Sequence, residues 1–243
     1  MSEIFLVLIL VFFGQTVGAL LGIIKKPTGL TTKASLAFAG SMMLGISFFE
    51  LLPEALQIAD CYLVFIGLLL GIFSMVLVDR ALPHIHPQLC KTKKPNLKRC
   101  AAMLVIGIAL HNLPEGLAIG IGFALTPSLG ILIALGIAAQ DIPENIATIV
   151  PLYGVIKKRT KSFLILVGTV LFELIGFGLG YFILRNVSQC ILGFSLALAA
   201  GFMVYISIEE LIPSAQIKRS PYIISLSIFL GFLTVLLMIF LLP

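Results

Sequence analysis

The chain has 243 residues, of which 60% are hydrophobic and 11% are charged, and its mean hydropathy is +1.16. Soluble domains carry about 25% charged residues, so this composition excludes an ordinary soluble protein and predicts an integral membrane protein. The net charge of +5 does not require a nucleic-acid partner, because the basic residues are placed as membrane topology demands.

Eight apolar runs are long enough to cross a bilayer as helices, since its hydrocarbon core needs about 20 helical residues. We expect these helices at residues 4–23, 34–57, 62–80, 101–123, 128–153, 162–184, 191–213 and 221–242. The predicted fold class is therefore all-α integral membrane. The whole chain, 1–243, forms one transmembrane domain with no separate soluble domain.

The basic residues predict how the chain is oriented. Fifteen of the 16 Lys and Arg residues lie in or beside the connections after the first, third, fifth and seventh helices, and only Arg185 lies on the other side. Basic connections of this kind stay in the cytoplasm. We therefore expect a multi-pass protein of the plasma membrane with both termini extracytoplasmic.

An internal repeat relates the two ends of the chain. Shifted by 160 residues, the first three helices align without a gap on the last three. The matches with most weight are Met43 with Met203, Ser47 with Ser207, Glu50 with Glu210, and Pro53 with Pro213. Three crossings are an odd number, so the second copy is inverted. The expected arrangement is 3+2+3, with repeat one at 1–83, a cytoplasmic loop at 81–99, central helices at 100–155 and repeat two at 161–243. Such folds place substrate sites near the midplane.

Two related motifs lie in the middle of the central helices, His-Asn-Leu-Pro-Glu-Gly at 111–116 and Gln-Asp-Ile-Pro-Glu-Asn at 140–145. On a helix, the His and Glu of the first motif share one face, as do the Asp and Glu of the second. The prolines are expected to kink both helices and to free backbone oxygens, which is tolerated at this depth only within protein or around a polar cavity. Ionisable residues here usually line a site or a path.

The acidic residues predict a cation site. No Lys or Arg occurs from 101 to 156, so the carboxylates there have no basic partner and must either take up protons or bind cations. Glu115, Glu144 and Glu173 recur every 29 residues near the middle of their helices, which places them at one depth. With Asp141 they carry four negative charges, which two divalent cations would balance.

His111 and Met43 extend the candidate ligand set. Imidazole, carboxylate and thioether groups together suit zinc or cadmium, and tolerate iron or manganese better than calcium or magnesium. Met43 is preferred to Met42 because Glu50 and Glu54 lie on the same side of its helix. One alternative is a buried hydrogen-bonded network that only stabilises two kinked helices, and methionine is also a common packing residue.

Further polar residues lie toward the two membrane faces. Glu50 and Glu54 near the outer face, and Glu209 and Glu210 near the inner face, would form the entry and exit of a cation path, or they would be solvated helix ends. The loop after the third helix carries candidate ligands for a regulatory metal, with a plain solvated loop as the alternative. These candidates are His84, His86, Cys90 and Cys100.

Glycines spaced by four residues occur in the first, fourth and sixth helices. Such spacing lets helices approach closely, so we expect these three helices to pack near one another, unless it only reflects the abundance of glycine in membrane helices. The glycines are Gly14, Gly18 and Gly22, then Gly116 and Gly120, then Gly176 and Gly180.

The paired motifs at 111–116 and 140–144 resemble the metal motifs of the ZIP (Zrt/Irt-like) family of divalent metal transporters, most closely its bacterial branch. The resemblance covers the whole chain. It implies a binuclear site and a bundle of helices 1, 4, 5 and 6 that moves against helices 2, 3, 7 and 8. The implied ligands of one ion are Met43, His111, Glu115, Gln140 and Glu144. Those of the other are Asn112, Glu115, Asp141, Glu144 and Glu173. Gln140, where many members have His, leaves the metal preference open.

The function predicted from the sequence is transport of Zn²⁺, or of Cd²⁺, Fe²⁺ or Mn²⁺, into the cytoplasm by alternating access. The metal is the transported cargo, and two ions are expected in the site. No prosthetic group is expected. A membrane metal sensor that binds without transporting is the alternative. An intramembrane metalloprotease is not expected, because the chain has no H-E-x-x-H string. Homodimer formation stays open.

Overall fold

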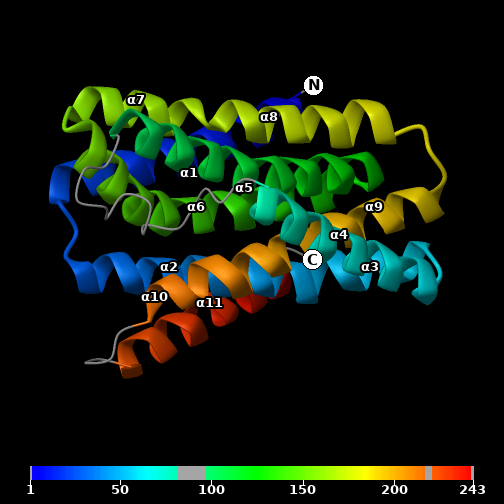
Figure 1. The fold of residues 1–243 in the computed structure, drawn as a ribbon. Coiled ribbons are helices and arrows are strands. Elements are labelled where there is room, and N and C mark those ends of the chain that lie inside the picture. The colour runs from blue at the N-terminus through cyan, green and yellow to red at the C-terminus, as the bar shows by residue number, and fades with distance from the viewer. Residues whose placement is uncertain (1, 82–96, 217–220, 242–243) are drawn as a thin grey trace.

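The computed structural model describes residues 2–81, 97–216 and 221–241, and every regular element within these ranges is a helix (Figure 1). The α-helices are α1 (Ser2–Lys25), α2 (Gly29–Ile46), α3 (Leu52–Ile58), α4 (Cys61–Ala81), α5 (Leu97–Leu125), α6 (Pro127–Ile156), α7 (Arg159–Gly168), α8 (Val170–Gly178), α9 (Gln189–Ile206), α10 (Ile212–Ala215) and α11 (Pro221–Leu241). The π-helical turns η1 (Ser47–Leu51), η3 (Leu179–Ile183) and η4 (Ser207–Leu211) continue α2, α8 and α9. The all-α prediction is confirmed.

Eight helical segments of the described chain are long and apolar enough to cross a membrane. They are Glu3–Lys25, Gly29–Ile58, Cys61–Ala81, Cys100–Leu125, Pro127–Ile156, Arg159–Ile183, Gln189–Ala215 and Pro221–Leu241. The eight predicted spans are confirmed, and the largest difference is the earlier start of the second. Its helix begins at Gly29 because the Thr28 hydroxyl accepts a hydrogen bond from the Thr31 N–H at 3.2 Å, which caps the first turn.

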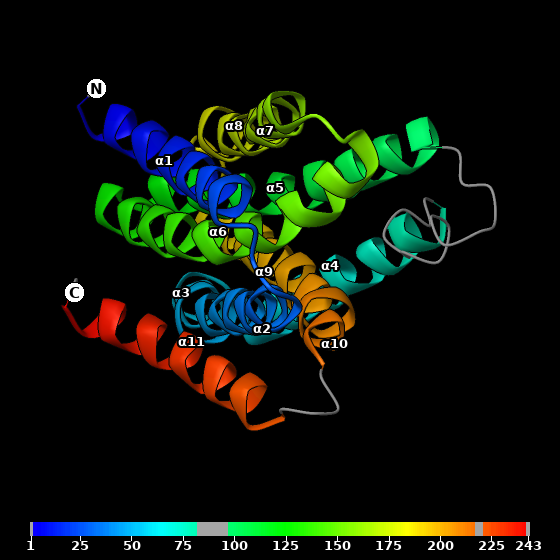
Figure 2. The same cartoon turned by 90° about the vertical axis from the view of Figure 1, so that its left-hand side faces the viewer.

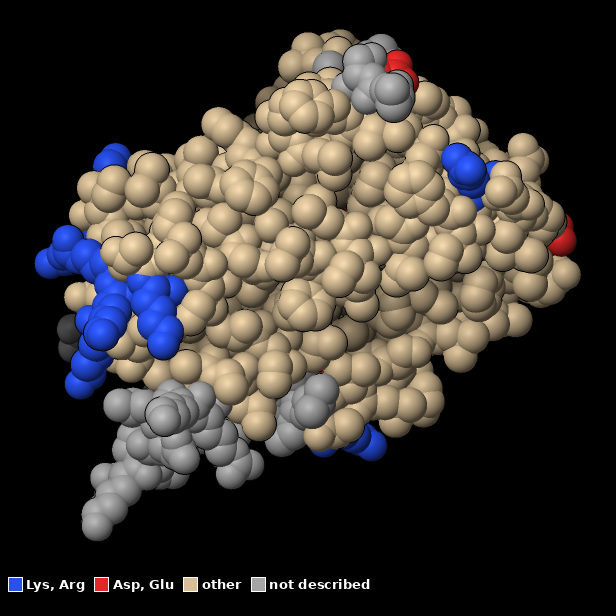
Figure 3. All heavy atoms as spheres, turned by 90° about the horizontal axis from the view of Figure 1, so that it is seen from above, with Lys and Arg blue, Asp and Glu red and all other residues tan. Residues whose placement is uncertain are grey.

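Charged side chains are sparse on the face drawn in Figure 3, where Lys and Arg gather mainly at one end and a broad uncharged band covers the middle. We call this the basic end and define it by the α1–α2 and α6–α7 connections, which carry Lys25, Lys26 and the four basic residues of 157–161. A wide apolar band between charged ends matches the environment of a bilayer.

The helices form two groups that lie side by side (Figure 2). In one group, α1 packs along α6, and α5 packs along both α6 and α8. In the other, α4 packs along α9, and α11 along α2. The groups meet mainly where α2 contacts α6 and α5 contacts α9. The two central motifs, on α5 and α6, therefore lie at the boundary between the groups.

The π-helical turns η1 and η4 have the same local cause. Ser47 and Ser207 each donate a side-chain hydrogen bond of 2.8 Å to the carbonyl four residues earlier. Pro53 and Pro213 follow two residues after each turn and cannot donate to the helix. The Leu52 N–H donates to the Ser47 carbonyl, five residues back, rather than to a carbonyl four residues back. The Ile212 N–H donates in the same way to the Ser207 carbonyl. The two turns are 160 residues apart, which is the offset of the predicted repeat; the inverted arrangement of the repeats stays a prediction.

The glycine rows bring particular backbones together. A Cβ at Gly116 would overlap the Glu173 carbonyl, and one at Gly176 would overlap the Leu113 carbonyl, so α5 and α8 touch through their main chains. A Cβ at Gly14 would lie 2.5 Å from the Ala138 carbonyl oxygen of α6. The predicted contact of the fourth and sixth spans is confirmed. The glycines of the first span, however, face the fifth span, because α6 separates α1 from α5.

Candidate metal site

The candidate ligands come from two long helices and a third that touches them. α5 carries His111, Asn112 and Glu115, and α6 carries Gln140, Asp141 and Glu144. Both helices continue through their central prolines as single α-helices. Glu173 lies on α8, where the close contact of Gly116 with the Glu173 backbone brings it to the level of the first motif.

These polar side chains are withdrawn from solvent although they belong to the most hydrophilic residue types. Each is at most 6% exposed, and Gln140 and Glu173 are 0% exposed. Such residues are rarely buried unless they are paired or bind a cation. The seven residues on α5, α6 and α8 therefore form the polar interior of an otherwise apolar bundle.

Direct hydrogen bonds link the central helices to each other and to the sixth span. The Gln140 Nε2 donates to Glu115 Oε1 at 2.6 Å. The Asn112 Nδ2 donates to the Thr169 hydroxyl at 3.3 Å. Thr169 lies in the break between α7 and α8, four residues before Glu173, and its hydroxyl also donates to the Leu166 carbonyl at 2.6 Å. One hydrogen bond thus joins the two central helices, and a separate pair of bonds ties the first motif to the sixth span.

The carboxylates of the site also act on one another. Glu115 lies within electrostatic range of Asp141 and Glu144, and Asp141 lies within range of Glu173. The like charges of four buried acids repel when all are ionised. A cation bound among them would relieve this repulsion.

Several of these acidic and amide groups have no hydrogen-bond partner. Of the buried side-chain nitrogen and oxygen atoms in the described ranges, eight lack one. Five belong to predicted ligands, namely Gln140 Oε1, Asp141 Oδ2, Glu144 Oε2 and both oxygens of Glu173. Buried polar atoms are nearly always bonded in folded proteins. A concentration of unbonded oxygens at one place indicates atoms available to bind a cation.

His111 connects the site to a cavity. Its Nε2 donates to Glu210 Oε2 at 2.7 Å, across the boundary between α5 and η4. Both residues and Glu144 line a cavity of about 260 Å³. The same cavity reaches Thr32, Val155 and Ser214, which lie near the basic end of α2, α6 and α10. The candidate site is therefore accessible from the basic end.

The opposite end is much more closed beside the second span. The gap at Glu50, lined by Ile46, Ile133 and Val235 among others, holds only about 10 Å³. This is about the space of one water molecule. Glu50 and Glu54 are half-buried, and their predicted role as an entry stays a prediction.

For the remaining predicted residues, their positions do not decide whether they bind metal. Met43 is completely buried on α2, but so is Met42, so burial does not favour either as a ligand. Glu209 is exposed and does not line the cavity that Glu210 enters. Cys100 is buried at the start of the fourth span. His84, His86 and Cys90 lie outside the described residues.

No three His, Cys, Asp or Glu side chains within 2–81, 97–216 and 221–241 are arranged as a ready-made metal site. The oxygen atoms without partners nevertheless fit a cation chemically, because carboxylate and amide oxygens are metal ligands. The two ligand sets implied by the resemblance stay predictions, and closing around an ion would require side chains of the site to turn.

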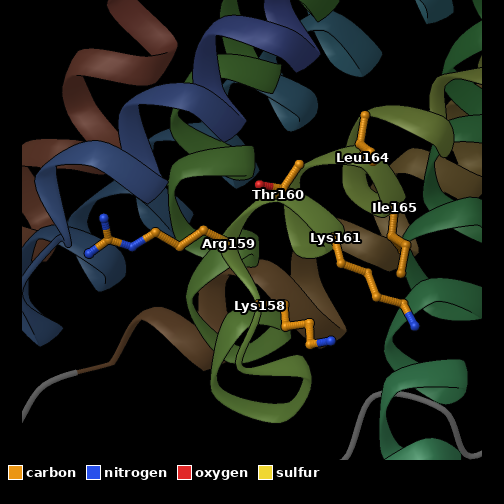
Figure 4. Close-up of a pocket in the computed structure, with 6 residues that line it drawn as sticks. All are labelled: Lys158, Arg159, Thr160, Lys161, Leu164 and Ile165. Atoms are coloured by element: carbon orange, nitrogen blue, oxygen red, sulfur yellow. The ribbon is translucent and has the colours of Figure 1, made fainter.

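A second hollow, at the α6–α7 connection, has the opposite chemistry (Figure 4). Its lining includes Lys158, Arg159 and Lys161, together with the apolar Leu164 and Ile165. Three positive charges repel a metal cation at this place. The cavity at His111 and Glu144 is therefore the better candidate for a cation route.

Comparison with known proteins identifies the family. A family model described as "ZIP Zinc transporter" matches residues 91–240. Over 212 residues, the chain is 36% identical to the zinc transporter ZupT of Enterobacter sp. (strain 638) and 37% identical to that of Escherichia coli O127:H6 (strain E2348/69 / EPEC). Each alignment covers 82% of this chain and 81% of the relative. The chain belongs to the ZIP zinc transporter family.

Membership of the ZIP family confirms the resemblance to its bacterial branch. It also confirms that the chain is a multi-pass membrane protein of divalent metal transport. Ionisable residues inside a membrane protein usually line a site or a path, so the buried acids remain the candidate ligands of this ZIP protein.

Two buried polar residues near the candidate site were not predicted from the sequence. Gln15 on α1 is 1% exposed, and Thr169 is 2% exposed. Gln15 is the only Asn or Gln within the apolar helix α1. Its position there could have been used to predict a buried polar role. Thr169 gave no signal, since a threonine in a membrane helix commonly bonds its own backbone.

Thr169→Val is expected to destabilise the protein by about 1–3 kcal/mol, because it leaves the buried Asn112 amide without its acceptor. Thr169→Ser, which keeps the hydroxyl, should retain most of the stability. Thermal unfolding of the purified protein in detergent measures both variants. Equal midpoints for Thr169→Val and wild type would show that the Asn112 contact contributes nothing to stability.

Proposed function

We propose that this protein carries Zn²⁺, or a related divalent transition metal such as Cd²⁺, Fe²⁺ or Mn²⁺, into the cytoplasm by alternating access. The observation that carries the proposal is the set of buried oxygens without partners on Gln140, Asp141, Glu144 and Glu173. Four acids without a Lys or Arg partner need a counter-charge, and two divalent ions would supply it. The zinc named for the ZupT relatives suits the same mixture of ligands.

The contact of His111 with Glu210 supports a route from the site to the basic end. The His111 Nε2–H donates to Glu210, so a metal that binds this nitrogen would have to displace the proton and break the hydrogen bond. Glu210 would then be the next residue along the cavity that could bind the ion. Glu209, which is exposed, has no part in the proposed route.

The division of the helices into two groups supports alternating access. The site residues of α5, α6 and α8 belong to one group, while Met43 and Glu210 belong to the other. A shift of one group against the other would change which end of the molecule reaches the ions. With the cavity open at the basic end, and with basic connections in the cytoplasm, this arrangement corresponds to an inward-facing state of a plasma-membrane protein whose termini lie outside.

Zinc flux into proteoliposomes loaded with a zinc-sensitive dye tests the proposal. Wild type should give a saturable flux, and Glu144→Ala should reduce it to the level of protein-free liposomes. Glu3→Ala, which removes an exposed acid from the start of α1, should transport like wild type. Competition with cadmium, iron and manganese would rank the substrates.

Two results would contradict the proposal. Wild-type flux in Glu144→Ala would remove the site from the mechanism. Stoichiometric zinc binding by a wild-type protein that never transports zinc would instead favour a membrane metal sensor. No enzymatic role is proposed, because the sequence has no H-E-x-x-H string.

A further inference from the structure

Gln15 is a buried amide that the proposed ligand sets leave unused. It lies on α1, is 1% exposed, and neither its Nε2 nor its Oε1 has a hydrogen-bond partner. An amide in an apolar interior normally satisfies both groups, because leaving water without a new bond is unfavourable. Two unbonded atoms on one fully buried side chain therefore call for a ligand or partner.

The neighbouring glycines hold this turn of α1 against the acidic turn of α6. A Cβ at Gly14 would lie 2.5 Å from the Ala138 carbonyl oxygen, and one at Gly18 would lie 2.5 Å from that of Ile142. Gly18 also approaches the Asp141 carbonyl. The backbone of α1 on both sides of Gln15 is thus in contact with the residues that flank Asp141, where α1 runs beside α6 (Figure 2).

Glu173 lies on the other side of Gln15. The Gln15 amide lies beside the Glu173 carboxylate and interacts with it as a weak hydrogen-bond donor would, but no hydrogen bond with ordinary distance and angles joins the two side chains. Glu173 in turn lies within electrostatic range of Asp141. Five unbonded polar atoms thus belong to three neighbouring residues: both amide atoms of Gln15, both oxygens of Glu173, and Asp141 Oδ2.

The chemistry of this group fits a divalent cation. Two carboxylates supply two negative charges, and an amide oxygen is an uncharged ligand that metal sites in proteins commonly use. The amide nitrogen can at the same time donate to a carboxylate and hold its orientation. Two ionised carboxylates cannot donate hydrogen bonds to each other, whereas a cation can bind to both.

We infer that Gln15 completes the half of the metal site that contains Asp141 and Glu173, with its Oε1 binding the cation and its Nε2 donating to one of the carboxylates. This inference rests on the proposed function. It assigns to α1 a direct part in metal binding, in addition to its packing on α6.

Isothermal titration of the purified full-length protein with Zn²⁺ in detergent tests the inference. Wild type should bind two ions. Gln15→Leu should lose the second ion or weaken its binding roughly 10- to 100-fold, as is typical when a supporting group of a metal site is removed. The matched control is Thr16→Val, an isosteric change of the adjacent residue, which lines an apolar hollow with Phe12 and Phe13. Thr16→Val should bind both ions like wild type.

A second variant is expected to gain zinc binding, so its result cannot be explained by a failure to fold. Gln15→Glu adds a third carboxylate to the group, so the zinc-dependent rise in its unfolding temperature should exceed that of wild type. A rise no larger than that of wild type would overturn the role of Gln15 as a ligand, as would two ions of wild-type affinity in Gln15→Leu. If wild type itself bound no zinc, the proposed function would fail and the inference with it.

Discussion

Glu115→Ala is expected to abolish high-affinity binding of both zinc ions, because Glu115, like Glu144, belongs to both proposed ligand sets. Glu115 is 1% exposed, accepts the 2.6 Å bond from Gln140, and lies within range of Asp141 and Glu144. In the proposed site it bridges the two ions, so its loss should exceed the roughly 10- to 100-fold effect of removing a supporting group.

Thermal unfolding with and without zinc measures this effect. Zinc at about 100 times its dissociation constant should stabilise the wild type by about 2.7 kcal/mol, because it binds only the folded protein. Glu115→Ala should gain no stability from the same zinc. The matched variant Glu115→Gln keeps the shape and removes the charge. A zinc-dependent gain in Glu115→Gln equal to that of wild type would show that the carboxylate charge is not needed.

Gly176→Ala should separate α8 from α5 and so disturb the site from a distance. The added methyl group would overlap the Leu113 carbonyl and lie 2.8 Å from the Leu117 nitrogen. Both contacts are backbone atoms of a long helix and cannot move aside cheaply. Overpacking of this kind costs about 1–3 kcal/mol of stability, and Glu173, three residues earlier, would be displaced from the central motifs.

Gly178→Ala is the matched control on the same helix, since nothing lies within 4 Å of a Cβ at this position. Alanine there should be neutral or should stabilise the helix by up to about 1 kcal/mol. The unfolding temperature and the zinc flux of both variants measure the effect. Flux and stability of Gly176→Ala equal to those of Gly178→Ala would show that the close contact of α5 and α8 is not required.

The two acids predicted at the exit of the cation path differ in their positions in the structure. Glu209 and Glu210 were predicted together as an exit, yet only Glu210 lines the cavity and contacts His111. Consecutive helical residues point about 100° apart, so two neighbouring acids rarely face the same cavity. Which one faces inward depends on how span seven is rotated in the bundle.

Sequence reasoning did not anticipate where the helices depart from regular α-helix. Kinks were predicted at Pro114 and Pro143, where α5 and α6 continue as single helical segments, and these kinks stay predictions. The departures from α-helix occur in spans two, six and seven, at η1, η3, η4 and Thr169. For η1 and η4, the combination of a back-bonding serine and a proline six residues later decides the change, and neither residue alone predicts it.

The sequence by itself determined the number and limits of the spans, the helical class and the identity of the buried acids. It could do so because a bilayer forces each long apolar run to satisfy its own backbone as a helix, which makes each span a local property. Only the tertiary structure decided which faces meet: Gln15 beside Glu173, His111 on Glu210, and Gly116 against the Glu173 backbone. Helices that are apolar on almost every side carry little periodic signal for a buried face, so close backbone contacts between helices set these neighbours.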